Sequence, residues 1–109
     1  MIGFFCMKTY YLYILHSISS DKYYVGQSWN YKERLFHHNT DTKNTYTSKH
    51  KPWILKVVFE IGNDRGEALE IEKFIKKQKS RNLLQKLIDP NFVPEGRLAQ
   101  LVRVPHVRD

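Results

Sequence analysis

An acidic side chain lies within the apolar stripe of a predicted helix over residues 64–79. On a helical wheel of about 100° per residue, Glu72 falls between Ala68 and Ile75, on the face that should be buried. A buried carboxylate is costly unless it is paired with a cation or bound to one. The spacing therefore leaves two alternatives open: an ion pair with a lysine or arginine, or a ligand of a metal ion.

An arginine and a histidine share one face of an earlier predicted helix. Arg34 and His38 are four residues apart, and they flank the side that carries Tyr31 and Leu35. We therefore expect a fixed positive charge and a titratable imidazole at the edge of the surface that packs on the sheet. The alternative, which is the commoner outcome for such a pair, is two solvated side chains on a basic helix.

Tyrosines are concentrated in the first two predicted strands, at Tyr10, Tyr11, Tyr13, Tyr23 and Tyr24. Packing is the default role of a tyrosine in a strand. A phenol that points into a cleft would instead serve as a hydrogen-bond donor or a proton acceptor. Gly26, at the end of the second strand, indicates a bend or a close approach of another group to the backbone.

Positive charge dominates the chain. Its 18 lysines and arginines exceed its 11 aspartates and glutamates, and the formal net charge is +7. Such an excess favours a polyanionic partner, nucleic acid before an acidic membrane surface, and a basic protein without such a partner is the alternative. Within a polar segment, Lys43, Lys49, His50 and Lys51 form a basic loop that would either contact phosphates or be solvated.

Chain length and cysteine content restrict the class of protein. The 109 residues suffice for one domain with one modest core. The single cysteine, Cys6, excludes an intramolecular disulfide and a zinc site with paired thiolates. No apolar run approaches the roughly 20 residues that a membrane span needs, and residues 1–7 lack the basic lead of a signal peptide. We therefore expect a cytoplasmic protein without a membrane partner.

The elements that must position these side chains begin with a hairpin. Two strands, 10–15 and 22–27, are separated by a short polar turn, which predicts antiparallel pairing. A helix over 31–38 follows, and Asn30 and Glu33 have the spacing of a capping box at its start.

A third strand and two more helices complete the predicted fold. Over 53–61, alternate residues from Trp53 to Ile61 are apolar and should face one side. Helices are then predicted over 64–79 and 80–88. The order strand, strand, helix, strand, helix, helix predicts an α/β (α+β) fold with a small, three-stranded, mainly antiparallel sheet flanked by helices.

The predicted elements divide the chain into three parts. We expect an N-terminal extension over 1–9, a single domain over 10–89, and an irregular C-terminal tail over 90–109.

Taken in order, the predicted segments resemble the GIY-YIG nuclease family. Tyr11–Tyr13 stands at the first motif of that family and Tyr24–Gly26 at the second. The further matching segments are Glu33–Leu35, His38–Asn39, Tyr46–Thr47, Pro52–Trp53 and Glu67–Glu72. Each short motif is weak alone, whereas the ordered set, which spans about 10–88, is specific. The first motif departs from the family name, because Tyr11 stands where the name has glycine. More narrowly, the chain resembles the small stand-alone members of the family.

The resemblance implies a set of site residues. Tyr13 and Tyr24 would orient or deprotonate the attacking water, and Arg34 would hold the scissile phosphate. His38 would assist proton transfer or position the nucleophile. Glu72 would hold one divalent metal ion, Mg²⁺ or Mn²⁺.

The function implied by the resemblance is a metal-dependent endonuclease that acts on nucleic acid, with DNA favoured over RNA. We expect it to be structure-selective, in DNA repair or recombination. A non-catalytic nucleic-acid-binding module of the same fold is the main alternative, and the full set of five site residues argues against it. A structural or protein-interaction domain would need a sizeable exposed apolar patch.

Overall fold

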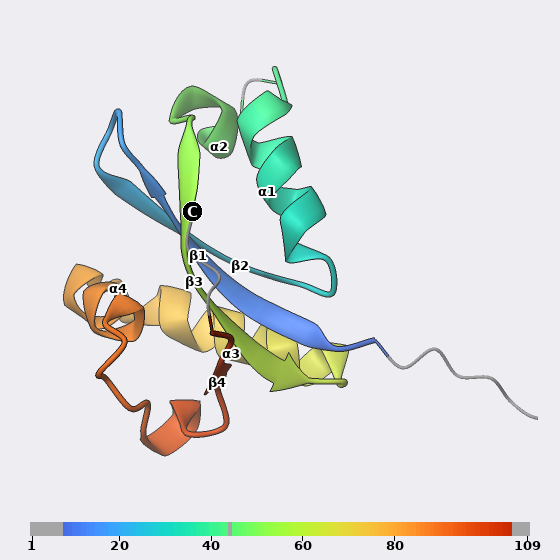
Figure 1. Ribbon diagram of the computed structural model, residues 1–109, viewed down its shortest axis with the longest axis vertical. Helices are drawn as coiled ribbons and strands as arrows, with labels where there is room; N and C mark the ends of the chain where they lie inside the picture. Colours follow the sequence, from blue (N-terminus) through green and yellow to red (C-terminus); the bar gives the residue numbers. More distant parts are fainter. Residues whose placement is uncertain (1–7, 44, 106–109) are drawn as a thin grey trace, which may run out of the picture.

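The computed structural model describes residues 8–43 and 45–105, and the expected extension over 1–9, with Cys6, lies almost wholly outside them. The strands are β1 (Tyr10–Ser17), β2 (Lys22–Ser28), β3 (Trp53–Gly62) and β4 (Val102–Arg103). The helices are α1 (Tyr31–Thr40), α2 (Tyr46–Lys49), α3 (Arg65–Gln78) and α4 (Arg81–Ile88), followed by the short 3-10 helix η1 (Gly96–Leu98) (Figure 1). The predicted α+β class, an antiparallel sheet flanked by helices, is confirmed. None of the helices in the described ranges is long and apolar enough to cross a membrane.

The sheet has the strand order β2-β1-β3-β4, and every neighbouring pair is antiparallel. It therefore contains four strands rather than the three that were predicted. The fourth strand is only two residues long, and it pairs through Phe59 with Arg103 and through Glu60 with Val102. A strand of this length has no periodicity that a sequence pattern would reveal.

The tail also differs from the expected irregular appendage, because part of it belongs to the core. Leu98 and Leu101 are each 5% exposed and pack in the same cluster as the helices α3 and α4. The guanidinium of Arg103 donates hydrogen bonds to the carbonyl oxygens of Leu87 and Asp89, at 3.0 and 2.9 Å. These contacts close the end of α4 against the sheet.

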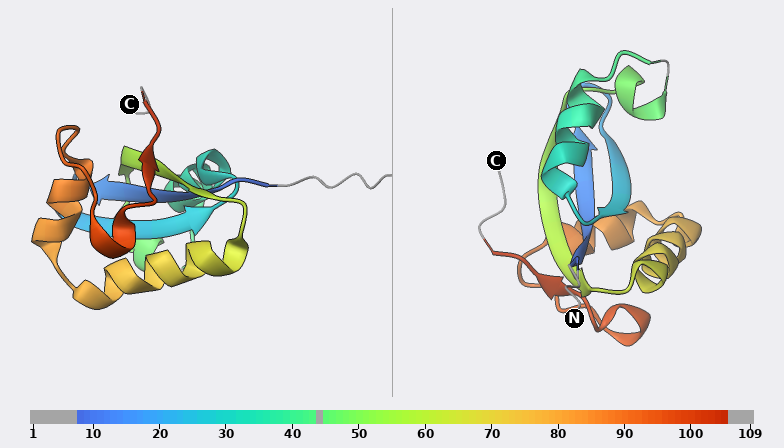
Figure 2. Two further views of the ribbon diagram at one scale, coloured as in Figure 1. Left: turned by 90° about the horizontal axis from the view of Figure 1, so that it is seen from below. Right: turned by 90° about the vertical axis from the view of Figure 1, so that its right-hand side faces the viewer.

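The two faces of the sheet carry separate apolar clusters, because successive residues of a strand point to opposite faces. Leu12 and Ile14 of β1 belong to the larger cluster, which α3 and α4 cover. Tyr13 and Leu15 belong to the smaller cluster, against which α1 packs through Leu35 (Figures 1 and 2). The helices α1 and α3 therefore lie on opposite faces, and both are near the edge strand β2.

The predicted single apolar face of β3 is wrong, and a β-bulge is the reason. The register shifts between the pairs Ile14–Val57 and Leu15–Leu55, which leaves Lys56 without a partner on β1. As a result Leu55 packs in the smaller cluster, whereas Val57 packs in the larger one. The bulge lets β3 contribute to both cores.

Side-chain caps fix where α1 and α3 begin. Asn30 accepts a hydrogen bond from the backbone N–H of Glu33, which is one half of the predicted capping box. The other half is not formed, because the N–H of Asn30 donates to the hydroxyl of Ser28 instead of the Glu33 side chain. Asp64 accepts from the N–H groups of Gly66 and Glu67 at the start of α3. These caps set the rotation of each helix, and hence which side chains reach the edge of β2.

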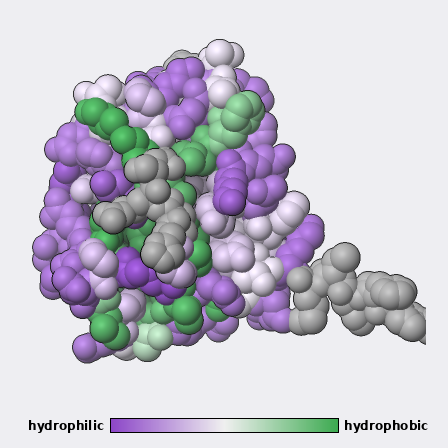
Figure 3. Space-filling model, viewed as in Figure 1, coloured by the Kyte–Doolittle hydropathy of each residue, from purple (hydrophilic) through white to green (hydrophobic). Residues whose placement is uncertain are grey.

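Apolar side chains remain exposed on several different elements. The hairpin turn carries Ile18, α1 carries Phe36 and the tail carries Val93, which are 60, 62 and 71% exposed. On the face drawn in Figure 3, apolar residues form separate groups among hydrophilic ones. Such a distribution is ordinary for a protein surface.

Candidate active site

The side chains singled out by the sequence gather at β2, the free edge of the sheet. Tyr24 projects from β2, and its ring lies 4.7 Å, centroid to centroid, from the imidazole of His38 on α1. On the other side, the ammonium group of Lys76 on α3 lies 5.3 Å from the centre of the same ring. Groups from the two faces of the sheet therefore meet around one tyrosine.

A buried, hydrogen-bonded pair forms the α1 side of this region. Tyr13 Oη and His38 Nε2 are 3.2 Å apart, and the two residues are 0 and 7% exposed. Burial raises the pKa of Tyr13 above its usual range, and the nearby phenol of Tyr24 raises it further. Burial also lowers the pKa of His38 to about 4, and the charge of Arg34 acts in the same direction. Near neutral pH both members of the pair are therefore uncharged.

Gly26 makes room for this pair. It lies directly opposite Tyr13 in the β1–β2 register, and a Cβ at position 26 would lie 2.4 Å from Tyr13 Oη. The close approach to the backbone that Gly26 indicated is therefore the phenol ring of Tyr13. Any larger residue would push that ring away from His38.

Arg34 lies one helical turn before His38 and borders the same space. The phenols of Tyr13 and Tyr24 raise the pKa of its guanidinium and outweigh burial, which acts in the opposite direction. A cavity of about 390 Å³, here called the central pocket, is lined by Tyr24, Arg34 and His38 together with residues of α2. Tyr13 is not among its lining residues, so it acts on the pocket only through its neighbours.

Glu72, on α3, is the last of the five predicted site residues. Its carboxylate lies 2.8 Å from the ammonium of Lys76, in an i,i+4 pair whose side chains are 18 and 47% exposed. The lysine ion pair, one of the two alternatives left open by the helical wheel, is thus present. The negative charge of Glu72 also contributes to the raised pKa of Tyr13. Glu72 lines a neighbouring cavity of about 480 Å³ rather than the central pocket.

A divalent metal ion would have Glu72 as its protein ligand. Among the described residues, no three His, Cys, Asp or Glu side chains cluster into a metal site by themselves. Mg²⁺ is often bound through one or two carboxylates, together with water and substrate phosphates. One mostly buried carboxylate that borders a cavity fits that mode of binding, provided that Lys76 gives up its ion pair.

The family model of the GIY-YIG catalytic domain matches residues 9–86. The chain belongs to the GIY-YIG family. The family consists of nucleases, which act on nucleic acid, and the match includes all five residues that the resemblance implied. A comparison with curated proteins gave no match to the chain.

The basic loop lies beside this GIY-YIG site without entering it. His50 bonds to the hydroxyl of Ser20 through Nδ1, at 2.9 Å, and Lys51 donates to the carbonyl oxygen of Asp41. Lys43 and Lys49 are exposed. Of the described residues that line the central pocket, none is one of these four. Their phosphate contacts stay a prediction.

Two residues that lie beside the predicted site residues were not predicted from the sequence. Lys76 stands four residues after Glu72, so the helical spacing was itself a signal for the ion pair. Tyr46 lies on α2, within a segment expected to be a loop, and it lines the central pocket. A helix of four residues, capped by Thr45, leaves little trace in the hydrophobic pattern.

Proposed function

We propose that this chain is a metal-dependent endonuclease that hydrolyses phosphodiester bonds, with DNA favoured over RNA, structure-selective and acting in repair or recombination. The observation that carries the proposal is that Arg34 and Tyr24 line one pocket, while Lys76, the ion-pair partner of Glu72, lies against the ring of the same Tyr24. The net charge of +7 supports a polyanionic substrate.

Charge complementarity assigns the scissile phosphate to the neighbourhood of Arg34. A phosphodiester is anionic and repels a nucleophile, so a fixed positive charge that strengthens its contact in the transition state accelerates hydrolysis. Arg34 lines the central pocket together with Tyr24. A divalent cation on Glu72 would act as a Lewis acid toward the phosphate oxygens.

The two tyrosines take different roles in the proposal. Tyr24 borders the central pocket, so its hydroxyl can orient the attacking water. Tyr13 is fully buried and does not touch the substrate, so it is a positioning residue. His38, with a pKa of about 4, is a weak proton acceptor near neutral pH, and it holds the rings of Tyr13 and Tyr24 in place.

The test is cleavage of labelled DNAs and RNAs in duplex, flap, branched and single-stranded form, with Mg²⁺, Mn²⁺ or EDTA. Wild type is compared with Glu72→Ala and with Glu67→Ala, which removes an equal charge from an exposed position of α3. We expect metal-dependent cutting that Glu72→Ala abolishes and Glu67→Ala retains.

Two results would count against the proposal. Cutting that survives in Glu72→Ala would remove Glu72 from the metal site. Salt-sensitive binding without any cutting would favour the non-catalytic module. The ion pair in which Lys76 neutralises Glu72 is consistent with that alternative.

A further inference from the structure

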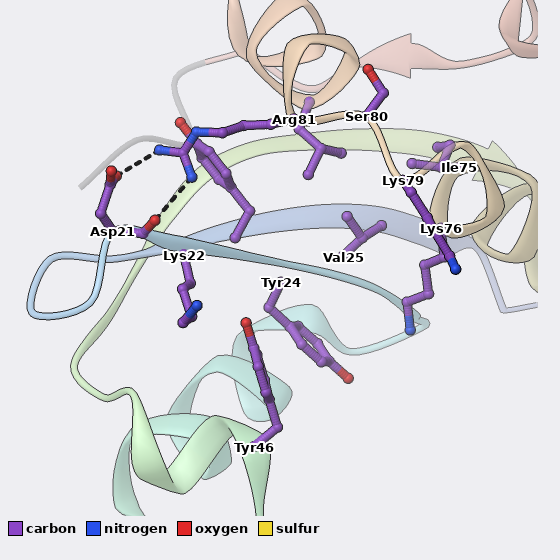
Figure 4. Close-up of a pocket in the computed structure, with 12 residues that line it drawn as sticks. Asp21, Lys22, Tyr24, Val25, Tyr46, Ile75, Lys76, Lys79, Ser80 and Arg81 are labelled. Carbon is purple, nitrogen blue, oxygen red and sulfur yellow. Dashed lines mark hydrogen bonds and ion pairs between the residues drawn. The ribbon is translucent and has the colours of Figure 1, made fainter.

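A second cavity adjoins the central pocket and has no role in the chemistry described so far. It has a volume of about 410 Å³ and shares Tyr24 and Tyr46 with the central pocket. Asp21 and Arg81 lie at one end, in the hairpin turn and at the start of α4, and the two tyrosines lie at the other (Figure 4). We call this cavity the flanking groove.

Positive charge predominates along the flanking groove. Lys22, Lys76, Lys79 and Arg81 line it, and Asp21 is the acidic residue among its described lining. Asp21 is already paired with Arg81. The two terminal nitrogens of Arg81 donate hydrogen bonds to the carboxylate and to the backbone carbonyl oxygen of Asp21, at 2.7 and 2.9 Å. In the described part of the chain, no ion pair holds Lys22 or Lys79. Two lysines are therefore available for an anionic ligand.

Aromatic rings form the wall where the two cavities join. Tyr46 is 48% exposed, and its ring centroid lies 6.1 Å from that of Trp53, as does the ring of Tyr24. Trp53 itself is buried and supports both rings. The ring of Tyr46 also contacts the imidazole of His50, at 4.8 Å between centroids, and about half of Tyr46 stays exposed. A partly exposed aromatic ring together with lysines that have no ion pair is the pattern by which proteins bind unpaired nucleotides, through base stacking and phosphate contacts.

The volume of the flanking groove suits one nucleotide. Its volume lies within the range of about 300–1,000 Å³ that is typical of small-ligand pockets. A base inside a duplex has both faces covered by its neighbours, so it presents no face to Tyr46 until it is unstacked.

We propose that the flanking groove binds an unpaired nucleotide next to the scissile phosphate, with its base stacked on Tyr46 and its phosphates near Lys22 and Lys79. The inference rests on the proposed function and specifies its substrate: a nucleic acid with an unpaired strand at the cut, such as a flap or single strand. Because the two cavities share Tyr24, a strand with one phosphate at Arg34 continues directly into the flanking groove.

The experiment compares two double variants that each remove two positive charges. Lys22→Gln/Lys79→Asn empties the flanking groove of its unpaired lysines. Asparagine suits position 79, where φ is 48°. The control, Lys77→Gln/Lys86→Gln, changes two exposed lysines of α3 and α4 that line neither the central pocket nor the flanking groove.

Binding is measured in EDTA by fluorescence anisotropy, with a single-stranded oligonucleotide and a blunt duplex over a range of salt concentrations. For the single strand, we expect the slope of log affinity against log salt to fall by about 1.4 in the groove variant, since each lost phosphate contact contributes about 0.7. In the control variant, this slope should fall by a smaller amount. Tyr46→Ala should weaken single-strand binding about tenfold, and Tyr46→Phe, which keeps the ring, should not.

Cleavage of a flap and of a continuous duplex with the same sequence at the cut is the second readout. The groove variant should lose the preference for the flap, whereas the control should keep it. Equal effects of the two double variants on single-strand binding would overturn the inference, even if wild type cuts both substrates. A selective binding loss in the groove variant supports it even if nothing is cut, and then the proposed nuclease function fails alone.

Discussion

The two sides of the site hold their functional groups in opposite ways. On the α1 side, Tyr13 and His38 form a buried, uncharged pair that a single hydrogen bond joins. On the α3 side, Glu72 and Lys76 form a charged pair that water reaches. The first pair cannot open without leaving buried polar atoms unsatisfied, which is costly. The second is a partly exposed ion pair, and such pairs contribute little to stability.

This difference separates the tasks of the two helices. We expect the α1 side to hold the ring of Tyr24 in place before any substrate binds, because the buried His38 contacts both tyrosines. In the proposed function, Glu72 releases Lys76 and binds a divalent cation, and we expect this exchange to cost little because the ion pair is partly exposed. Four predictions test this division, beginning with the largest expected effect.

Arg34→Ala should lower the cleavage rate about 100- to 1,000-fold, because a preorganised charge at the transferring phosphate is lost. Lys32→Ala is the matched control, since Lys32 is a basic, exposed residue of the same helix. Single-turnover rates at saturating enzyme separate this loss from weaker substrate binding. Similar, small effects of both substitutions would place the scissile phosphate elsewhere.

Removing one hydroxyl from each tyrosine should have opposite consequences. Tyr24→Phe should lower the cleavage rate about 100-fold with little change in stability, since Tyr24 borders the central pocket. Tyr13→Phe should lower the free energy of unfolding by about 1–3 kcal/mol, because the buried Nε2 atom of His38 loses its partner. Urea unfolding and cleavage assays on both variants measure the contrast. The reverse outcome would exchange their roles.

Stability should fall as the pH drops from about 6.5 to about 4. The pKa of His38 is lowered from its usual value of 6.5 to about 4, so the unfolded state binds more protons than the folded state in this interval. Urea unfolding at several pH values measures the slope. The slope should be shallower in His38→Gln than in wild type, and unchanged in His37→Gln, which alters the exposed neighbour. An equal slope in all three proteins would contradict a buried, neutral His38.

The smallest effect is expected on the α3 side. Lys76→Gln should lower the Mg²⁺ concentration for half-maximal cleavage about two- to fivefold, because it removes a cation that competes for Glu72. The measurement is made at saturating substrate, since Lys76 also lines the flanking groove. Lys77→Gln is the control, since Lys77 is an exposed lysine of the same helix that does not line the cavity of Glu72. A higher Mg²⁺ requirement in Lys76→Gln would mean that the lysine assists the metal rather than competing with it.

Much of the fold was predictable because it depends on neighbours in sequence. The hairpin and the N-cap of Asn30 follow from short-range patterns, and both are present. The bulge near Lys56 and the short strand β4 were not predicted, because each depends on pairing with a distant segment. The buried Leu98 and Leu101 were missed for the same reason, since no periodic pattern surrounds them.

The sequence by itself determined which groups are available: i,i+4 spacing brings Arg34 near His38 and Glu72 near Lys76, whatever the rest of the chain does. Tertiary structure alone decided what these groups face. The sheet register places Tyr13 over Gly26, and the packing of α1 brings His38 to the Tyr13 hydroxyl. Burial then keeps both Tyr13 and His38 uncharged near neutral pH. Desolvation depends on every atom that excludes water from a site, so no local spacing of residues encodes it.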